Sequence, residues 1–186
     1  MRPMFTSRVP FYFIRHGLTD HNEARLLTGQ LDIPLNEAGR FQAAQAAELM
    51  RGILVGKILA SPMRRALETA EAISATTGIP IQVLDDLKER SWGILEGRSV
   101  RERPAREAPE GGESADDFDA RVITALKSVI YNPPLLIVAH SGTCRVLRRY
   151  LRVEGSTGLV PNGVPLCFSP KPHGGGWRET RVRPRE

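Results

Sequence analysis

The chain has 186 residues, of which 41% are hydrophobic and 25% are charged, and its formal net charge is +5. This length fits one domain with a substantial core, and the composition is typical of a globular rather than a disordered chain. No stretch approaches the roughly 18 consecutive apolar residues that a membrane span needs, so we expect no membrane association.

Strands and helices are predicted to alternate along the chain. In chain order, apolar runs and helical spacing of apolar residues predict a strand at 9–14, a helix at 36–51, a strand at 57–60, a helix at 61–77, a strand at 79–84, a helix at 114–130, a strand at 135–139, a helix at 141–151 and strands at 164–168 and 177–182. Ser61 and Ser114 are the expected N-caps of their helices, and Gly78 is expected to end the second helix. This alternation predicts a three-layer α/β/α sandwich with a mostly parallel central sheet.

Two histidines follow predicted strands directly. His16 comes after the apolar strand at 9–14 and His140 after the apolar strand at 135–139. In open α/β sheets ligands bind beyond the carboxyl ends of the strands, so both imidazoles should emerge at one rim. Arg15 precedes the first histidine, and a guanidinium matches the donor geometry that a tetrahedral oxyanion requires. These residues together predict an anion-binding site rather than structural histidines.

Two further segments are expected to reach the same rim. The helix predicted after Ser61 directs its N-terminus there and carries Arg65 in its first turn, where a cation is favourable only if an anion compensates it. The simpler interpretation is a surface arginine paired with Glu68 or Glu71. Glu89 follows the strand at 79–84 and offers the proton donor that the histidines and arginines lack.

A set of motifs follows in a fixed order. They are Arg15-His16-Gly17 with Thr19 and Asn22, Gly29-Gln-x-Asp32-x-Pro34-Leu35, Ser61-Pro-x-x-Arg65-Ala66, Glu89 with Trp92-Gly93 and Glu96-Gly97, Gly112-Glu113-Ser114, Val138-Ala-His140-x-Gly142, and Asn162-Gly163. In this order they resemble the histidine phosphatase superfamily, the phosphoglycerate-mutase-like proteins, over about residues 11–168. The resemblance implies that fold and phosphoryl-transfer chemistry.

The resemblance assigns a role to each matched residue. His16 is implied as the nucleophile that forms a phosphohistidine, and Glu89 as the group that protonates the leaving oxygen and then deprotonates water. Arg15, Arg65 and His140 are implied to surround the phosphoryl oxygens. The other residues implied to contact phosphate or substrate are Gly17, which would keep backbone bulk away, Asn22 as a neutral donor, Thr28, Gly29 and Ser141.

Ser141 departs from the pattern, because the family has glycine after its second histidine. Serine is small enough to allow close approach, and its hydroxyl is also a candidate cap for the following helix. Substrate specificity is expected to depend on Leu18, His21, Trp92 and the loop at 98–110. For Trp92, stacking on a substrate ring and plain packing are both open, and packing is the simpler interpretation.

Hydrolysis is predicted over mutase activity. The mutases carry a long basic insertion after the acid motif that excludes water, whereas here only residues 98–110 separate Gly97 from Gly111, with prolines that oppose a long helix. Arg101, Arg103 and Arg106 keep the mutase alternative open, since they are able to hold a second anionic group. A solvated loop is the simpler interpretation of those arginines. A non-catalytic phospho-ligand-binding module is disfavoured because nucleophile and acid are both present.

The remaining expectations concern cofactors, partners and location. No metal or other cofactor is expected, because His16 and His21 have neither the spacing nor the carboxylates of a zinc motif. The expected partner is a small phosphorylated metabolite and not nucleic acid, since the densest basic cluster, Arg145 to Arg152, has the spacing of a solvated helix face. Two unpaired cysteines and no signal peptide predict a cytoplasmic protein. The sequence does not distinguish a monomer from a homodimer. We expect one domain over 1–186, with flexible tails at 1–8 and 183–186.

Overall fold

The computed structural model describes residues 9–129, 134–155, 158–172 and 175–184. The predicted N-terminal tail at 1–8, the last two residues of the C-terminal tail and the predicted helix end at 130 lie outside these residues. Among the described residues, no helix is long and apolar enough to cross a membrane.

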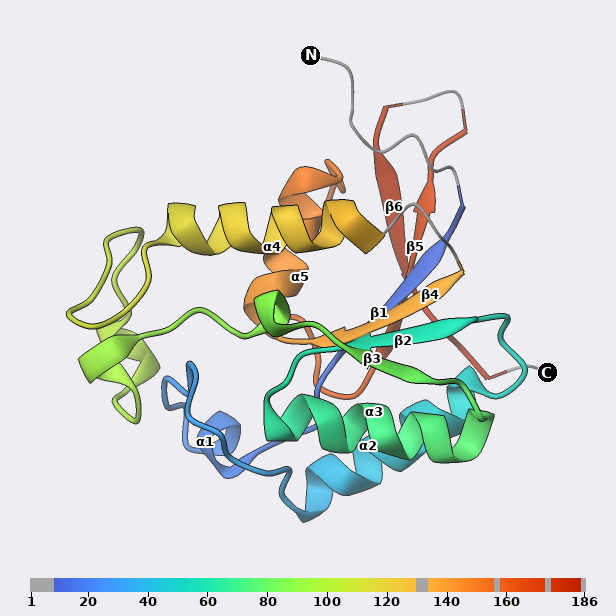
Figure 1. Cartoon of the computed structure of the whole chain (residues 1–186), viewed down its shortest axis with the longest axis horizontal. Helices are drawn as coiled ribbons and strands as arrows, with labels where there is room; N and C mark the ends of the chain where they lie inside the picture. Colours follow the sequence, from blue (N-terminus) through green and yellow to red (C-terminus); the bar gives the residue numbers. More distant parts are fainter. Residues whose placement is uncertain (1–8, 130–133, 156–157, 173–174, 185–186) are drawn as a thin grey trace.

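Strands and helices alternate through most of the chain, as the sequence predicts (Figure 1). In chain order the elements are β1 (Phe11–Arg15), α1 (Asp20–Glu23), α2 (Glu37–Met50), β2 (Lys57–Ala60), α3 (Arg64–Thr77), β3 (Ile81–Val83), α4 (Ala115–Val129), β4 (Leu135–Ala139), α5 (Ser141–Tyr150), β5 (Pro165–Pro170) and β6 (Trp177–Arg181). Three short 3-10 turns, η1 (Asp85–Leu87), η2 (Gly93–Leu95) and η3 (Val100–Glu102), lie in the long segment between β3 and α4.

The strands form one sheet in the order β3-β2-β4-β1-β5-β6. The first four of these are parallel to one another, whereas β5 pairs antiparallel with β1 and β6 antiparallel with β5. The predicted mostly parallel sheet is therefore confirmed. The two most apolar strands, β1 and β4, are neighbours at its centre, where both faces are covered by helices.

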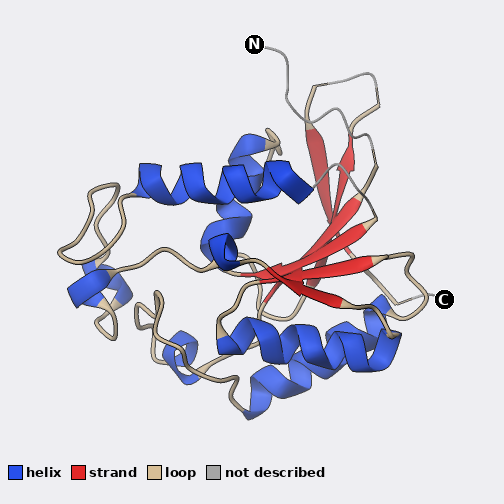
Figure 2. Cartoon of the chain, in the orientation of Figure 1, coloured by secondary structure: helices blue, strands red, loops and turns tan. Residues whose placement is uncertain are grey.

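Helices cover both faces of the sheet (Figure 2). On one face α2 and α3 pack against Ile14, Ile58 and Val138, and on the other α4 and α5 pack against Phe13 and Ile137. Because successive side chains of a strand point to opposite faces, β4 supplies both cores in alternation. The predicted three-layer α/β/α sandwich is confirmed.

One predicted helix start is wrong. The helix after β2 begins at Arg64, and its N-cap is Met63, which makes no side-chain cap bond, so Ser61 is not the cap. Ser61 instead continues directly from β2, and its backbone N–H donates to the carbonyl of Val138 at 3.0 Å. Ser114 does accept the N–H of Asp117 at the start of α4, and Gly78 ends α3 in the left-handed region with φ 74°.

Candidate active site

The central residues of the site lie at the carboxyl ends of three adjacent strands. β2, β4 and β1 lie side by side and parallel, and they are followed by Ser61, His140 and His16 respectively. The backbone N–H of His16 donates to the carbonyl of Ala139 at 2.9 Å, which aligns the two strand ends. The rings of His16 and His140 lie with centroids 5.2 Å apart, so the predicted pairing of the histidines is present.

The orientation of the His16 ring fixes which nitrogen carries a lone pair. Its Nδ1 lies 2.7 Å from the carbonyl oxygen of Gly17. A carbonyl oxygen only accepts hydrogen bonds, so Nδ1 must carry the proton and donate it. In the neutral ring Nε2 is then unprotonated and nucleophilic.

The surroundings of His16 favour that neutral ring. The side chain is buried, and burial, followed by the charges of Arg65 and Arg15, holds the pKa of His16 well below its usual 6.5. Burial and the charge of Arg65 likewise hold the pKa of His140 well below 6.5. Both imidazoles are therefore uncharged at neutral pH.

His140 is held by Ser61, which the sequence analysis assigns as the N-cap of the following helix. Its Nε2 lies 2.8 Å from the hydroxyl of Ser61, and both side chains are fully buried. Nδ1 of His140 is buried and has no hydrogen-bond partner among the described residues. Ser61 thus orients His140 instead of capping α3. His140 is fully buried and is not among the residues that line the cavity described next.

A cavity of about 510 Å³ opens at this rim. Its wall includes Arg15, His16, Arg65 and Glu89, four of the five predicted catalytic residues. Nε of Arg15 and Nε of Arg65 are buried without hydrogen-bond partners in the described part of the chain, as is Nδ1 of His140. Buried N–H donors without partners are unfavourable, and a bound oxyanion would satisfy those of Arg15 and Arg65. Two of the three residues predicted to surround the anion therefore lie in the wall of one cavity, whereas His140 lies buried beside His16 and is not among the lining residues.

Both arginines donate to backbone carbonyls, and neither pairs with a carboxylate among the described residues. Arg65 is 1% exposed, and its terminal nitrogens donate to the carbonyls of Leu31 and Gly29 at 2.9 and 2.8 Å. Burial lowers the pKa of Arg65 to about 10, so it stays charged at neutral pH. Arg15 donates to the carbonyl of Val160 at 2.9 Å. The alternative of a surface arginine paired with Glu68 or Glu71 is wrong, because Arg65 is buried and forms no ion pair with either glutamate among the described residues; Glu68 pairs with Arg64 instead.

Glu89 reaches the cavity from the edge of the sheet beyond β3. One carboxylate oxygen accepts the N–H of Gly142 at 3.0 Å and the other accepts the N–H of Arg90 at 3.0 Å. Gly142 lies in the first turn of α5, where the helix dipole favours a carboxylate. A Cβ at Gly142 would lie 2.0 Å from a Glu89 oxygen, so glycine at this position is what lets the acid approach.

Asn22 lies in the cavity wall and is oriented by Asn162. Nδ2 of Asn162 donates to Oδ1 of Asn22 at 3.1 Å and to the carbonyl of His16 at 2.9 Å. With its oxygen engaged, Asn22 has its amide N–H donors available to a ligand, as the sequence analysis expects. The sequence analysis includes Asn162 in the last of the family motifs but assigns it no role at the site.

Gly17, which is expected to keep backbone bulk away from the phosphate, is not among the residues that line the cavity. Its N–H donates to the hydroxyl of Thr69 at 3.0 Å. A Cβ at Gly17 would lie 2.3 Å from the carbonyl oxygen of Gly39. Glycine is therefore required here so that the chain can pass the start of α2, and its carbonyl serves to orient His16.

The other residues predicted to contact substrate do line the cavity: Thr28, Gly29 and Ser141. The Thr28 hydroxyl is buried without a partner among the described residues, whereas the carbonyl of Gly29 is used by Arg65. Ser141 is the first residue of α5, and its hydroxyl makes no cap bond. It instead accepts from Arg145 at 3.4 Å, so the capping alternative is wrong.

The expected specificity residues Leu18, His21 and Trp92 also line the cavity. Trp92 is buried, and the guanidinium of Arg90 lies 4.4 Å from its ring centroid. Because one face of the indole is covered by a cation, packing is the better description of Trp92. Within the described part of the chain, no group of three or more His, Cys, Asp or Glu side chains is placed to hold a metal ion.

Comparison with known proteins identifies the family. Residues 11–159 match the model of the histidine phosphatase superfamily (branch 1). The chain belongs to this superfamily. It is 35% identical over 140 residues to an uncharacterised phosphatase, PhoE, of Bacillus subtilis, covering 72% of both chains. It is 31% identical over 157 residues to a glucosyl-3-phosphoglycerate phosphatase of Mycolicibacterium vanbaalenii, covering 72% of this chain and 70% of the relative.

The structure is also similar to solved members of the superfamily. The native structure of a mycobacterial glucosyl-3-phosphoglycerate phosphatase superposes with a TM-score of 0.75 at 28% identity, over 92% of this chain and 96% of the other. The superfamily match ends at 159, whereas the described fold continues through β5 and β6.

The buried histidines of this superfamily member predict that it loses stability in mild acid. Folding depresses both pKa values below the unfolded value of 6.5, so the unfolded chain binds more protons as pH falls through 6.5. The free energy of unfolding should be maximal above pH 6.5 and fall below it by about 1–3 kcal/mol per pH unit, since one shifted group contributes roughly 1.4. Urea denaturation at pH 7.5 and 5.5 measures this. The slope should be smaller in His16→Asn, and a stability that is flat between these pH values would contradict buried neutral imidazoles.

Proposed function

We propose that this chain is a phosphatase that transfers the phosphoryl group of a small phosphomonoester to Nε2 of His16 and then to water. The observation that carries the proposal is the 2.7 Å contact from Nδ1 of His16 to the Gly17 carbonyl, which leaves the Nε2 lone pair available beside two buried guanidiniums. The phosphatase names of the relatives support the same chemistry.

In the first step the Nε2 lone pair of His16 attacks phosphorus while the bond from phosphorus to the ester oxygen breaks. Negative charge spreads over the three equatorial oxygens in the transition state. The Nε groups of Arg15 and Arg65, which are buried without partners in the described part of the chain, are proposed to donate to these oxygens from the cavity wall, and Nδ1 of the buried His140 is proposed as a third donor while its Nε2 accepts from the Ser61 hydroxyl. Because these donors are fixed before the reaction, little reorganisation is needed.

Glu89 is proposed to carry the proton in both steps. As a carboxylic acid it protonates the departing ester oxygen, so that the leaving group departs as an alcohol. As a carboxylate it then takes a proton from the water that attacks phosphohistidine, and the bond from Nε2 to phosphorus breaks to release inorganic phosphate. Its hydrogen bonds from Gly142 and Arg90 hold the carboxyl group in the cavity wall throughout.

Hydrolysis is favoured over return of the phosphoryl group by the openness of the cavity rim. Leu159 lies in the wall and is 93% exposed, and Arg25 in the same wall is also exposed. The segment at 98–110 forms only the short turn η3 and contributes Val100 and Arg103 to the wall. Water therefore has access to a phosphohistidine at this site.

We further propose that the reaction needs no metal ion and takes place in the cytoplasm. The positive charge around the reacting phosphate is supplied by Arg15 and Arg65, which do the work that a divalent cation does in other phosphoryl transfers. Cys144 and Cys167 are both free thiols, as expected in a reducing compartment. The proposed substrates are small phosphorylated metabolites.

The test is phosphate release in the presence of a chelator. Purified protein in about 1–10 mM EDTA should hydrolyse p-nitrophenyl phosphate at the same rate as protein without EDTA, because no proposed step uses a metal ion. Rapid denaturation in alkali during turnover of a ³²P-labelled ester should trap protein-bound label that is stable to alkali and released by acid, as a phosphohistidine is.

Two outcomes would refute the proposal in different ways. Loss of activity in EDTA that Mg²⁺ or Zn²⁺ restores would overturn metal independence and leave the nucleophile untouched. Isomerisation of 3-phosphoglycerate without phosphate release from any ester would show that return transfer, not hydrolysis, is the main reaction.

A further inference from the structure

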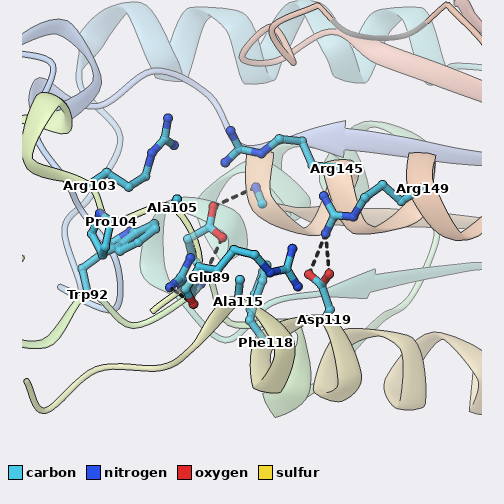
Figure 3. A pocket seen from close by; sticks show the side chains of 13 residues that line it. Glu89, Trp92, Arg103, Pro104, Ala105, Ala115, Phe118, Asp119, Arg145 and Arg149 are labelled. Carbon is cyan, nitrogen blue, oxygen red and sulfur yellow. Dashed lines mark hydrogen bonds and ion pairs between the residues drawn. The ribbon is translucent and has the colours of Figure 1, made fainter. Parts of the chain in front are cut away.

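Glu96 lies in the same sequence motif as Glu89, but it is not among the residues that line the cavity at the strand ends. One of its carboxylate oxygens, Oε1, accepts the backbone N–H of Gln30 at 2.8 Å and that of Trp92 at 3.1 Å. Trp92 lines the same pocket as Glu89, the proposed proton donor (Figure 3). A single oxygen therefore joins two segments that are far apart in the chain.

The loop that Glu96 holds is the one on which Arg65 rests. The two terminal nitrogens of Arg65 donate to the carbonyls of Gly29 and Leu31, the residues on either side of Gln30. The carbonyl of Gly29 and the N–H of Gln30 belong to one peptide group, which is planar and rigid. Glu96 on one side of this peptide group and Arg65 on the other are therefore linked through a single rigid unit.

Gly29 is what allows the carboxylate to come this close. Its φ is +51°, in the left-handed region that favours glycine, and a Cβ there would lie 2.2 Å from Oε1 of Glu96. The backbone at Gly29 is thus shaped to receive the carboxylate on one side and the guanidinium on the other.

Two further hydrogen bonds join the same segments without touching that peptide group. The side-chain Nε2 of Gln30 donates to the carbonyl of Glu89 at 3.1 Å, and the N–H of Gly97 donates to the carbonyl of Leu27 at 2.7 Å. These bonds do not depend on the Glu96 carboxylate. The segments should therefore stay joined when the carboxylate is removed, and the change should be confined to the peptide group that it holds.

Arg65 is sensitive to the direction in which that peptide group points. A guanidinium is planar and rigid, so the direction of its Nε follows from where its terminal nitrogens are held. The Nε of Arg65 is buried without a partner among the described residues and is the donor proposed for the phosphoryl oxygens. Burial lowers the pKa of Arg65 to about 10, and the charge of Glu96 is among those that oppose this fall, so the carboxylate also acts on Arg65 through space.

We propose that Glu96 is a positioning residue, which holds the N–H of Gln30 and thereby fixes the peptide group whose carbonyl directs the Arg65 guanidinium at the phosphoryl group. This inference rests on the proposed phosphatase function, because it takes Arg65 as a donor to the phosphoryl oxygens. Misplacement of a catalytic group by about 1 Å costs about 10²-fold in rate. Glu96→Ala should therefore lower kcat by about 10–100-fold although Glu96 is outside the cavity wall.

Glutamine and aspartate at position 96 separate the reach of the side chain from its charge. Glu96→Gln keeps a carbonyl oxygen at the same distance from the backbone but loses the charge, and its kcat should stay within about threefold of the unchanged protein. Glu96→Asp keeps the charge but draws the oxygens back by one carbon–carbon bond, about 1.5 Å, which is too far to hold both N–H groups. Its kcat should fall by about tenfold or more, as in Glu96→Ala.

Glu102→Ala is the matched control. Glu102 also accepts a backbone N–H, that of Ser99, and it pairs with Arg98, so the variant removes a comparable carboxylate from the same part of the chain. Its contacts do not reach the loop that holds Arg65. The kcat of Glu102→Ala should equal that of the unchanged protein.

Three measurements assign the effect to Arg65. The loss in Glu96→Ala should be the same for aryl and alkyl esters, because Arg65 contacts the phosphoryl group that they share. Orthovanadate, an analogue of the phosphoryl group in transfer, should bind about tenfold more weakly in calorimetry to Glu96→Ala and Glu96→Asp than to Glu96→Gln. In an Arg65→Gln background, Glu96→Ala should lower kcat by less than about twofold, since a residue that acts only through Arg65 adds no further loss.

The outcomes separate this inference from the function on which it rests. An equal loss in Glu96→Gln and Glu96→Ala, an unchanged kcat in Glu96→Asp, or an equal loss in Glu102→Ala would overturn Glu96 as a positioning residue and leave the phosphatase intact. A larger loss for alkyl than for aryl esters would assign Glu96 to the proton donor and also contradict the inference. Absence of phosphate release by the unchanged protein would instead overturn the proposed function, and vanadate binding would still decide the role of Glu96.

Discussion

Replacing His16 with alanine is expected to abolish turnover, with kcat reduced by about four orders of magnitude or more. His16 is the one predicted catalytic histidine in the cavity wall, because His140 is not among the lining residues and its Nε2 contacts the Ser61 hydroxyl. Without it the phosphoryl group has no nitrogen acceptor. Steady-state phosphate release and trapping of ³²P-labelled protein measure the loss.

A control must show that the anion site survives in His16→Ala. Arg15 and Arg65 are anchored by the carbonyls of Val160, Gly29 and Leu31 and not by His16, so the variant should still bind inorganic phosphate in calorimetry. Retained binding with lost turnover assigns the residue to the chemical step. Activity within about tenfold of the unchanged protein would rule out a covalent intermediate on His16.

Replacing Glu89 with glutamine should have the second largest effect, and its size should depend on the leaving group. For alkyl phosphates such as glycerol 3-phosphate, kcat/KM should fall by about 10²–10⁴-fold, since the alkoxide cannot depart without a proton. For p-nitrophenyl phosphate the fall should stay within about tenfold, because p-nitrophenolate is a stable anion. The measurement is kcat/KM across esters of graded leaving-group basicity.

The comparison between esters distinguishes proton transfer from a structural effect. Glu89 also accepts the N–H groups of Gly142 and Arg90, and glutamine keeps only one carbonyl oxygen for these two donors. If the variant acted only by disturbing this anchor, aryl and alkyl esters would lose activity by the same factor. An equal loss for both classes would therefore contradict Glu89 as the proton donor.

The sequence predicted the parts of the site that depend on strand ends. An unbroken apolar run marks a strand buried on both faces, so the strands before His16 and His140 had to be central, and parallel neighbours present their carboxyl ends at the same rim. Arg65 and Glu89 followed from the same rule, because each comes shortly after another strand of this sheet. The layers are confirmed for that reason, and His16, Arg65 and Glu89 line one cavity at that rim.

The partners that orient the catalytic groups were missed because they depend on contacts between distant segments. Ser61 lies 79 residues from His140, and in sequence a serine before a proline is typical of a helix start. Asn162 lies 146 residues from His16 and precedes a glycine, which is typical of a turn. Gly17 was assigned to the ligand because its packing against α2 is visible only once that helix is placed.

The attachment of the two histidines to the central strands has a consequence for how such a protein diversifies. Opening β1 or β4 requires breaking the hydrogen bonds of the sheet and both cores at once, so the nucleophile is held by the part of the molecule that opens last. Much of the remaining cavity wall is formed by residues outside the helices and strands, among them Thr28, Arg103 and Leu159. Mutations in these loops can therefore change which metabolite is bound while the residues that break the phosphate ester bond stay the same.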